Sequence, residues 1–318
     1  MRKKLAEQPE LCYNDFNIIT KMNCNTMKEN AHPFQRLLSW FFYLFLIFIR
    51  GEITVDIQER INQYWSMRAD EFSDAQLAEL KEYKRMNWTE QIKRALPDKK
   101  RIRALDLGTG AGFFSIILHD LNCEVVGIDY SQEMINHAIM NSEKLNCNDI
   151  WFLRMDAQAL EFPDESFDFI FTRNVTWTLP DPEKAYLEMI RVLAPGGRLM
   201  NCDANYGAAF LEADRAGEAG ELEESVHAAL SGRYEHPAQS LEMLRERNDI
   251  ASQLGISSLI RPQWDADILI SLGMKSITVD TNINRKIISD EERKRAEGSL
   301  KEKLWMNTSP LFMVLAEK

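Results

Sequence analysis

Short apolar runs alternate with helical patterns in the middle of the chain. The run at residues 104–107 enters a glycine-rich turn, a helical pattern opens behind the turn, and a second apolar run at 125–128 ends on the carboxylate of Asp129. Another strand-like run follows at 150–154. Strands that alternate with helices are typical of α/β proteins, so this order predicts an α/β fold.

A helical pattern precedes these strands. Ile53, Ile57, Ile61 and Tyr64 recur at spacings of four, four and three, with Trp65 beside them. This spacing places the four side chains along one face of a helix. We expect that face to pack on the domain.

The last third of the chain resumes the alternation after an insertion. Residues 206–262 are rich in Glu, Ala and Leu, which predicts a helical segment. Beyond it, residues 268–279 have the pattern of a helix followed by a strand, and 310–316 that of a final strand. Open α/β sheets bind ligands beyond the carboxyl ends of their strands, so an insertion here is placed to act as a lid over a pocket. The alternative is a helical elaboration packed away from the pocket.

The N-terminal segment departs from this pattern. Residues 37–49 are an uncharged, strongly apolar run between Arg36 and Arg50. As a helix the run reaches about 20 Å, short of the roughly 30 Å hydrocarbon core of a membrane. The long polar stretch before it and the missing small-residue cleavage site argue against a signal peptide. Three interpretations stay open: a helix packed on the domain or a partner, an interfacial membrane anchor, and an extension foreign to the working protein.

The glycine-rich turn carries candidate chemistry. Gly108, Gly110 and Gly112 let a strand turn sharply into a helix and let a ligand approach the backbone closely. A carboxylate about 20 residues further on, at the tip of the neighbouring strand, is placed to accept hydrogen bonds from the two hydroxyls of a ribose. Asp129 occupies that position, which predicts a site for a nucleotide-type cofactor.

The spacing of the turn distinguishes two classes of cofactor. A dinucleotide site has the pattern G-x-G-x-x-G, whereas the third glycine here comes one residue early and Asp106 precedes the first glycine by two. An acid beside the turn repels a pyrophosphate but suits a cofactor with an ammonium group. Residues 106–112 match D-x-G-x-G-x-G in full. At this point the chain resembles the class I S-adenosylmethionine (SAM)-dependent methyltransferases, whose first motif this is.

The resemblance continues in motif order through residue 205. Residues 155–160 are similar to the family's adenine-binding segment, 162–173 to its loop and fourth strand, and 179–199 to its helix, turn and fifth strand. The Pro-Gly-Gly at 195–197 is expected to stop that helix. The resemblance implies a Rossmann-like fold: a seven-stranded, mostly parallel sheet with an antiparallel last strand, plus a helical lid insertion. It implies SAM as the cofactor and S-adenosylhomocysteine (SAH) as the product.

The same resemblance implies which residues hold the cofactor. Asp156 would take the exocyclic amine of adenine, and the Ala157 backbone would meet the ring. Tyr64, on the entry helix, would reach the methionine end, and Arg68 would pair with a carboxylate; ordinary core aromatics and a surface arginine are the alternative. The cofactor-binding candidates are Tyr64, Asp106, Gly108, Thr109, Gly110, Gly112, Asp129, Tyr130, Ser131, Asp156, Ala157 and Asn174.

Catalytic candidates follow the fourth and fifth strands. Methyl transfer from a sulfonium is an in-line displacement, so its catalysis is largely alignment and desolvation. A base is needed only where the nucleophile arrives protonated and weakly acidic. Among the polar residues expected near the methyl group, which include Thr176 and Asn205, we select Asp203, Asn174 and Trp177. Asp203 is the candidate base or substrate anchor; the alternative is an acid that caps the following turn.

The segment after the fourth strand bears on the class of acceptor molecule. Residues 173–180 lack the Asn/Asp-Pro-Pro-Tyr/Phe motif common in methyltransferases that act on amino groups of nucleobases or glutamine. They look more like the group that includes quinone, sterol and other small-molecule methyltransferases. Trp177 and Thr178 stand where a histidine is frequent, so histidine-based catalysis is not carried over. We predict a SAM-dependent methyltransferase with a small-molecule acceptor; a membrane-associated quinone or lipid methyltransferase and a non-catalytic SAM-binding protein are the alternatives.

Composition and length set bounds on partners and domains. A net charge of −11 argues against a nucleic-acid partner, because phosphate neutralisation needs a basic face. The five cysteines form no C-x-x-C pair or metal-ligand array, so we expect no metal and a reducing, cytoplasmic location, with membrane contact through 37–49 left open. The patterns divide the 318 residues into an extension with an apolar helix (1–52), a cofactor-binding core with its entry helix (53–205), the helical lid insertion (206–262) and the C-terminal part of the core sheet (263–318).

Overall fold

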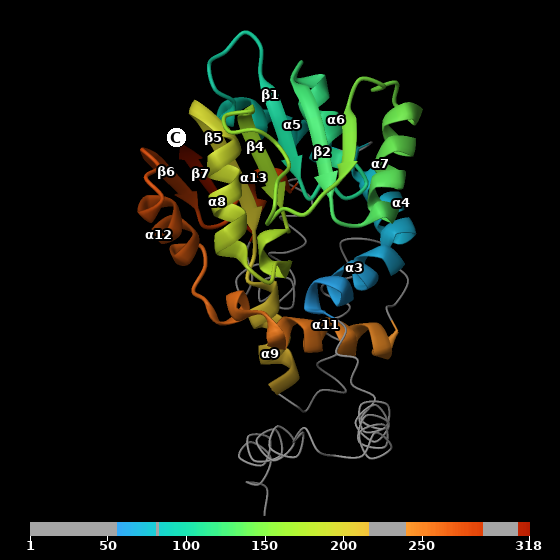
Figure 1. The fold of residues 1–318 in the computed structure, drawn as a ribbon. Coiled ribbons are helices and arrows are strands. Elements are labelled where there is room, and N and C mark those ends of the chain that lie inside the picture. Colours follow the sequence, from blue (N-terminus) through green and yellow to red (C-terminus); the bar gives the residue numbers. More distant parts are fainter. Residues whose placement is uncertain (1–55, 81–82, 216–239, 289–310) are drawn as a thin grey trace, which may run out of the picture. The chain divides into compact units, whose positions relative to one another are not determined.

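A computed structural model describes residues 56–80, 83–215, 240–288 and 311–318 (Figure 1). The apolar run at 37–49 and Ile53 lie outside the described residues. Among the helices that are described, none combines the length and the apolar character that a membrane crossing requires.

A seven-stranded sheet forms the core, in the order β3-β2-β1-β4-β5-β7-β6. Pairs that include β7 are antiparallel, and the other neighbouring pairs are parallel. The strands are β1 (Arg103–Leu107), β2 (Glu124–Asp129), β3 (Trp151–Arg154), β4 (Phe167–Arg173), β5 (Leu193–Asp203), β6 (Ser276–Asp280) and β7 (Phe312–Glu317). The predicted mostly parallel sheet with an antiparallel last strand is confirmed.

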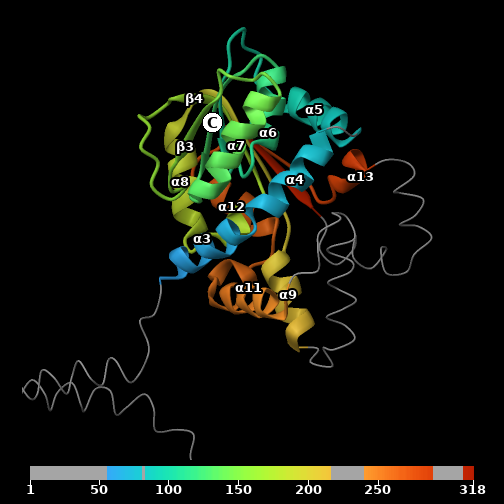
Figure 2. The same ribbon diagram turned by 90° about the vertical axis from the view of Figure 1, so that its right-hand side faces the viewer.

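Helices cover both faces of the sheet (Figures 1 and 2). One face packs on α5, α6 and α13, and the other on α8 and α12. The described helices are α3 (Ile57–Met67), α4 (Ala69–Leu80), α5 (Tyr83–Ala95), α6 (Phe113–Asp120), α7 (Gln132–Lys144), α8 (Pro182–Val192), α9 (Tyr206–Arg215), α11 (Leu241–Gln253), α12 (Gln263–Ser271) and α13 (Asn284–Ile287), with the 3₁₀ turns η1 (Thr176–Thr178) and η2 (Gly255–Ser258).

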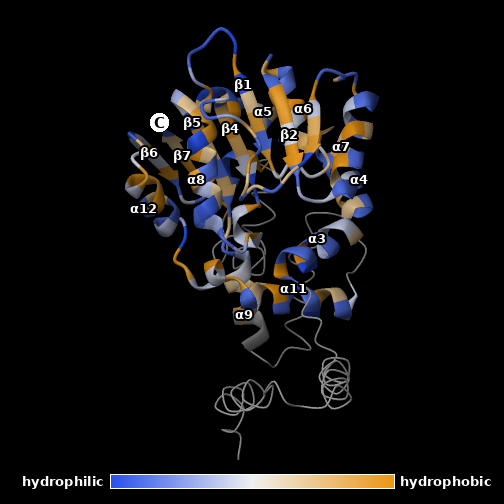
Figure 3. Cartoon of the chain, viewed as in Figure 1, coloured by the Kyte–Doolittle hydropathy of each residue, from blue (hydrophilic) through white to orange (hydrophobic). Residues whose placement is uncertain are grey.

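Central strands are apolar on both sides because both faces are covered. On β4, Phe169 and Phe171 belong to the core under α5 and α6, whereas Ile170 belongs to the core under α8, and all three are fully buried. Figure 3 shows this apolar character in the central strands. A parallel sheet buried in this way leaves the carboxyl edge of its strands as the place for a ligand.

A layer of helices lies beyond that carboxyl edge (Figure 2). Ile61 and Tyr64 of α3 pack on Ile250 of α11 and on Leu254, which directly follows it, and α11 also packs on α9. The expected helical face of Ile61 and Tyr64 is therefore confirmed, and it meets a helix from within the 206–262 segment. Within that segment the described residues form α9, α11 and η2.

The junction between α8 and β5 differs from the expectation that Pro-Gly-Gly stops the helix. Helix α8 ends at Val192, and residues 195–197 already lie within β5. The pairing of β4 with β5 shifts register here, Gly196 has φ +72°, and its N–H donates to the carbonyl of Lys318 at 2.9 Å. The three residues therefore form an irregularity at the start of the strand, because the backbone pairs with the chain terminus.

Candidate active site

The glycine-rich turn lies between β1 and α6. Gly108 has φ +71°, and a Cβ atom built on it would lie 2.2 Å from Cγ2 of Val175. Gly112, with φ +92°, is the N-cap of α6. The Thr109 N–H donates to the carbonyl of Ile128 at 2.8 Å, which ties the turn to β2. The backbone at Gly108 thus needs a residue without a side chain, both for its angle and for the room beside it.

Asp106 is buried beneath this turn and does not line the cavity described below. Its Oδ2 accepts hydrogen bonds from the hydroxyls of Thr109 (2.6 Å) and Ser115 (2.7 Å). Burial raises the pKa of the Asp106 carboxyl to about 6, and the two hydroxyls oppose that shift. We had expected this acid to face a ligand's ammonium group; in the structure it instead holds the two sides of the turn together.

Asp129 lies at the end of β2, beside the turn. Its Oδ2 accepts from the N–H of Gly110 (3.0 Å) and its Oδ1 from the N–H of Ser131 (2.9 Å). Ser131 in turn is the N-cap of α7, and its hydroxyl accepts from the N–H of Met134. Burial raises the pKa of the Asp129 carboxyl, and the backbone hydrogen bonds oppose that shift. The carboxylate is thereby fixed at the mouth of the glycine turn, with further acceptor positions on both oxygens.

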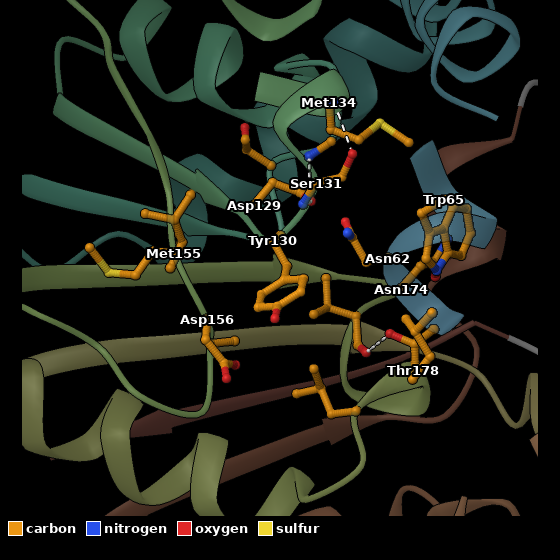
Figure 4. A pocket seen from close by; sticks show the side chains of 18 of the residues that line it. Asn62, Trp65, Asp129, Tyr130, Ser131, Met134, Met155, Asp156, Asn174 and Thr178 are labelled. Atoms are coloured by element: carbon orange, nitrogen blue, oxygen red, sulfur yellow. Dashed lines mark hydrogen bonds between the residues drawn. The ribbon is translucent and has the colours of Figure 1, made fainter. Parts of the chain in front are cut away.

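A cavity opens at this edge and holds about 990 Å³ of empty space, its open mouth included. Figure 4 shows Asp129 and Ser131 from the β2–α7 junction, Asp156 from the loop after β3, and Trp65 from α3. Of the expected site residues, the cavity is lined by Gly108, Thr109, Gly110, Asp129, Tyr130, Ser131, Asp156, Ala157 and Asn174.

Helix α3 contributes a wall of this cavity, but through different residues from the one expected. Tyr64 is buried and does not line the cavity; its hydroxyl accepts from Arg68 Nη1 at 3.3 Å. Trp65 lines it together with Gln58, Ile61 and Asn62. These four lie at helical spacing, so the 3.6-residue period identifies the face once the position of the helix is known.

The chain after β4 contributes another part of the cavity wall. Asn174 has φ +58°, a conformation that asparagine tolerates better than most residues. Its N–H donates to the Cys202 carbonyl (2.9 Å), and its own carbonyl accepts from Trp177 Nε1 (3.1 Å). Trp177 does not line the cavity; its ring lies edge-on to Trp65, with the centroids 6.4 Å apart. The expected catalytic pair therefore divides into Asn174, which meets the cavity, and Trp177, which supports it.

Asp203 lies at the end of β5 but outside the cavity lining, and it is fully buried. Its Oδ2 accepts from the Thr176 hydroxyl, the Trp177 N–H (3.0 Å) and Arg261 Nη1 (3.0 Å), and its Oδ1 from the Ala204 N–H (2.8 Å). Burial raises the pKa of the Asp203 carboxyl, and Arg261 opposes that shift. With its oxygens engaged away from the cavity, Asp203 is not placed to act as a base or to anchor a substrate.

Three further polar side chains line the cavity, those of Asn174, Gln76 and Arg173, and only the first was among the expected site residues. The side-chain oxygens Asn174 Oδ1 and Gln76 Oε1 are buried and make no hydrogen bond within the described residues. Arg173 also lines the cavity; its guanidinium lies over the rings of Phe114 and Trp88 and 3.8 Å from Glu79 Oε2. Arg173 directly precedes Asn174 at the end of a strand in the α/β pattern, and that position was the available signal for it.

Comparison with known proteins agrees with this geometry. Residues 98–250 match the family model of a methyltransferase domain. A phosphatidylethanolamine N-methyltransferase of Cereibacter sphaeroides is 37% identical over 99 residues, which are 31% of this chain and 48% of the relative. A demethylmenaquinone methyltransferase of Thermus thermophilus is 37% identical over 117 residues, 36% of this chain and 53% of the relative. The chain spans about half the length of these curated relatives.

A solved structure is similar in fold. Phosphoethanolamine N-methyltransferase 2 of Haemonchus contortus, in complex with S-adenosyl-L-methionine, matches with a TM-score of 0.50 and 22% sequence identity, over 73% of this chain and 52% of that chain. The strand order, the glycine turn with its carboxylate at the end of β2, and the domain match agree. Residues 98–250 therefore match a methyltransferase domain, and the fold is that of the class I SAM-dependent methyltransferases.

Proposed function

We propose that this chain transfers a methyl group from SAM to a small-molecule acceptor in the cavity at the carboxyl edge of the sheet. The observation that carries the proposal is the set of polar residues that line the cavity: Asp129, and Asn174 and Gln76, whose side-chain oxygens have no hydrogen-bond partner within the described residues. A buried acceptor without a donor is costly, about 1–3 kcal/mol, so such atoms mark where a ligand's donors belong.

The residues present fit the nucleoside part of SAM. Asp129 offers acceptor positions for two ribose hydroxyls, as the family motif requires. Asp156 lines the cavity, with one oxygen held by the Gln158 N–H at 2.8 Å. We assign Asp156 to the exocyclic amine of adenine and the Ala157 backbone to the ring. Tyr130 and Ser131 line the same side.

The residues also fit the methionine part, in a way that changes the expected assignment. An α-ammonium group needs acceptors, and Asn174 Oδ1 and Gln76 Oε1 supply them. A carboxylate needs a cation, and we assign this role to Arg173, which lines the cavity, in place of Arg68, which donates to Tyr64. Asp106 is assigned to the support of the turn, because its carboxylate is buried beneath it.

The chemistry then depends on alignment. When bound, SAM supplies an electrophilic methyl group on a sulfonium, which an acceptor attacks in line. Trp65 and Asn174 both line the cavity, and apolar side chains such as Ile61 and Val175 line it beside them; a site lined in this way favours desolvation of the reacting groups. Asp203 and Trp177 are assigned to holding the Asn174 wall, because neither meets the cavity.

The acceptor class rests on the relatives and on the segment after β4. The relatives are named for ethanolamine compounds and a quinone, which are small molecules with an amine or a ring as the accepting group. We propose that this chain methylates an acceptor of this class. We also propose that the protein is cytoplasmic. The membrane-associated subtype, which depended on residues 37–49, remains a hypothesis because that run lies outside the described residues.

A methyl-transfer assay tests the proposal. Purified chain is incubated with SAM labelled on the methyl group and with phosphoethanolamine, phosphatidylethanolamine vesicles or a short-chain demethylmenaquinone in detergent. Label in one small-molecule product, absent with Asp129→Ala, is expected. SAH binding without label in any product would favour the non-catalytic SAM-binding protein and contradict the proposed transfer.

A further inference from the structure

A charged side chain lies buried behind the cavity wall. Arg261, in the segment between η2 and α12, has a side chain only 1% exposed. Its guanidinium donates to both carboxylate oxygens of Asp265 (Nε 2.8 Å, Nη2 2.6 Å), to Asp203 Oδ2 (3.0 Å) and to Thr176 Oγ1 (2.6 Å). A buried cation persists only where it is paired and hydrogen-bonded, and here both conditions hold.

The partners of Arg261 come from three separate parts of the chain. Asp203 ends β5, Asp265 lies on α12, and Thr176 begins η1. The Tyr186 hydroxyl of α8 donates to Asp265 at 2.7 Å and extends the network. One guanidinium thus joins segments that are adjacent only because of the fold, and η1 is the one nearest the cavity.

The turn η1 depends on this network for its position. Its Thr176 hydroxyl donates to Asp203 Oδ2 and accepts from Arg261, and the Trp177 N–H donates to the same Asp203 oxygen at 3.0 Å. The turn is too short to be held by its own hydrogen bonds, since a 3₁₀ segment of this length has few. Its location is therefore set by Asp203, which Arg261 keeps charged and oriented.

The position of η1 matters for the cavity because the residues around it form a wall. Asn174, Val175 and Thr178 line the cavity. Val175 also packs on the glycine turn so closely that no Cβ fits on Gly108 between them, the distance being 2.2 Å. A shift of η1 would move Val175 relative to the glycine turn and move the unpartnered oxygen of Asn174.

We propose that Arg261 is a positioning residue for the cofactor site: through Asp203 and Thr176 it holds η1 so that Asn174 and Val175 stand against the glycine turn. This inference rests on the proposed function, because it assumes that the cavity holds the cofactor. Arg261 does not line the cavity, so its effect on binding passes through η1. It also joins the stem of the 206–262 segment to the cavity wall.

A matched control separates positioning from general stability. Arg103 forms an ion pair with Asp168 (3.0 Å) at the amino end of β1 and β4, the end of the sheet opposite the cavity. Like Arg261, it joins a carboxylate to a neighbouring segment. The variants Arg261→Met and Arg103→Met each remove the charge of an arginine from an ion pair, but only the first pair is connected to η1.

Binding of SAH is measured by isothermal titration calorimetry at a temperature where circular dichroism shows each full-length variant folded. We expect Arg261→Met to raise the Kd of SAH at least tenfold, Arg261→Lys to give an intermediate value, and Arg103→Met to stay within twofold of the wild type although its Tm falls. If Arg261→Met does not fold, Thr176→Val provides the same test, because it removes the hydroxyl between Arg261 and Asp203.

The outcomes distinguish the inference from the function on which it rests. A folded Arg261→Met or Thr176→Val chain that binds SAH like the wild type would overturn the positioning role and leave the cofactor site intact. An equal loss of SAH affinity in Arg103→Met would also overturn it, since the effect would then follow stability. Failure of the wild-type chain to bind SAH would overturn the proposed function itself.

Discussion

Asp129 and Asp203 occupy equivalent places in the sheet and have opposite surroundings. Each is the last residue of a parallel strand, β2 and β5, at the same carboxyl edge. Asp129 lines the cavity and is held by two backbone amides. Asp203 is fully buried and faces a guanidinium and two donors of η1. The first is available to a ligand, whereas the second is occupied by the protein.

The difference teaches that the position of an acid at a strand end does not decide its role. What decides it is the group that the rest of the chain brings to it. Arg261 lies 58 positions after Asp203 and fills the space in which a ligand would otherwise meet the carboxylate. At Asp129 the neighbouring chain offers only backbone N–H groups, which orient the carboxylate and leave acceptor positions on its oxygens.

The largest expected effect is the loss in the free energy of unfolding when the buried acid Asp203 is removed. Asp203→Ala leaves Arg261 with a buried charge that Asp265 alone must compensate, and breaking such a pair costs about 3–5 kcal/mol. Asp129→Ala removes acceptors for two backbone amides near the cavity mouth and should cost about 1 kcal/mol. Urea unfolding of both variants measures the difference. Equal losses would show that the two acids do not differ in the way the structure indicates.

A pH dependence is expected at a third acid, Asp106, whose carboxyl is buried under the glycine turn. Burial raises the pKa of this carboxyl from its ordinary 3.8 to about 6 in the folded chain, so the folded state holds the proton more tightly. Its contribution to the free energy of unfolding is therefore present below pH 4 and is lost as the pH rises through 6, by up to about 3 kcal/mol. Asp106→Asn should gain that much stability relative to the wild type between pH 4 and pH 7 in urea unfolding. Parallel pH profiles of the two proteins would argue against a buried, ionising Asp106.

A methyl group added at Gly108 tests whether the glycine turn beside Asp129 belongs to the cofactor site. Gly108→Ala places a side chain where φ is +71° and where Val175 leaves no room, so we expect the folded state to lose about 2 kcal/mol. We also expect SAH to bind more weakly, because Gly108 and Val175 both line the cavity and one of them must move. Gly273→Ala is the matched control, because φ there is +83° but nothing lies within 4 Å of the added Cβ. Calorimetry should show normal SAH binding for Gly273→Ala. Equal SAH affinity in Gly108→Ala and Gly273→Ala would contradict the role of the glycine turn in cofactor binding.

The smallest effect is expected far from the cavity, at Asp168. Arg103 and then Lys99 hold the pKa of this carboxyl well below its usual range, so its contribution to stability is present at neutral pH and is lost as the pH falls below about 4. Because Arg103 is partly exposed, we expect the contribution to be about 1 kcal/mol. Arg103→Met should therefore lower the free energy of unfolding at pH 7, and the difference from the wild type should become smaller as the pH falls from 4 to 2.5. A constant difference across that range would contradict this assignment.

Much of the fold could be predicted from the sequence because each element is marked locally. The apolar runs, the glycine turn and the acid at the end of β2 are signals within a few residues. The seven-stranded, mostly parallel sheet with its antiparallel last strand followed from the resemblance. The Pro-Gly-Gly at 195–197 was misplaced because its conformation depends on pairing with Lys318, at the other end of the domain. The residues of the turn alone do not indicate that its backbone pairs with Lys318.

The site was predictable in part for the same reason. Of the glycines and carboxylates in the short motifs, Gly108, Gly110, Asp129 and Asp156 line the cavity as expected, whereas Asp106 and Gly112 do not. That Trp65 and not Tyr64 lines the cavity depends on the rotation of α3 about its axis. That Asp203 is paired within the protein depends on Arg261. Both are tertiary facts, and the second comes from a segment that carries no family motif.

The central claim is tested most directly by isothermal titration of SAH and of NAD into the wild-type chain and into Asp129→Ala. The account predicts that the wild type binds SAH and not NAD, and that Asp129→Ala binds SAH at least tenfold more weakly because the ribose hydroxyls lose their acceptor. Binding of NAD in place of SAH, or undiminished binding of SAH to Asp129→Ala, would contradict the assignment of this cavity to SAM.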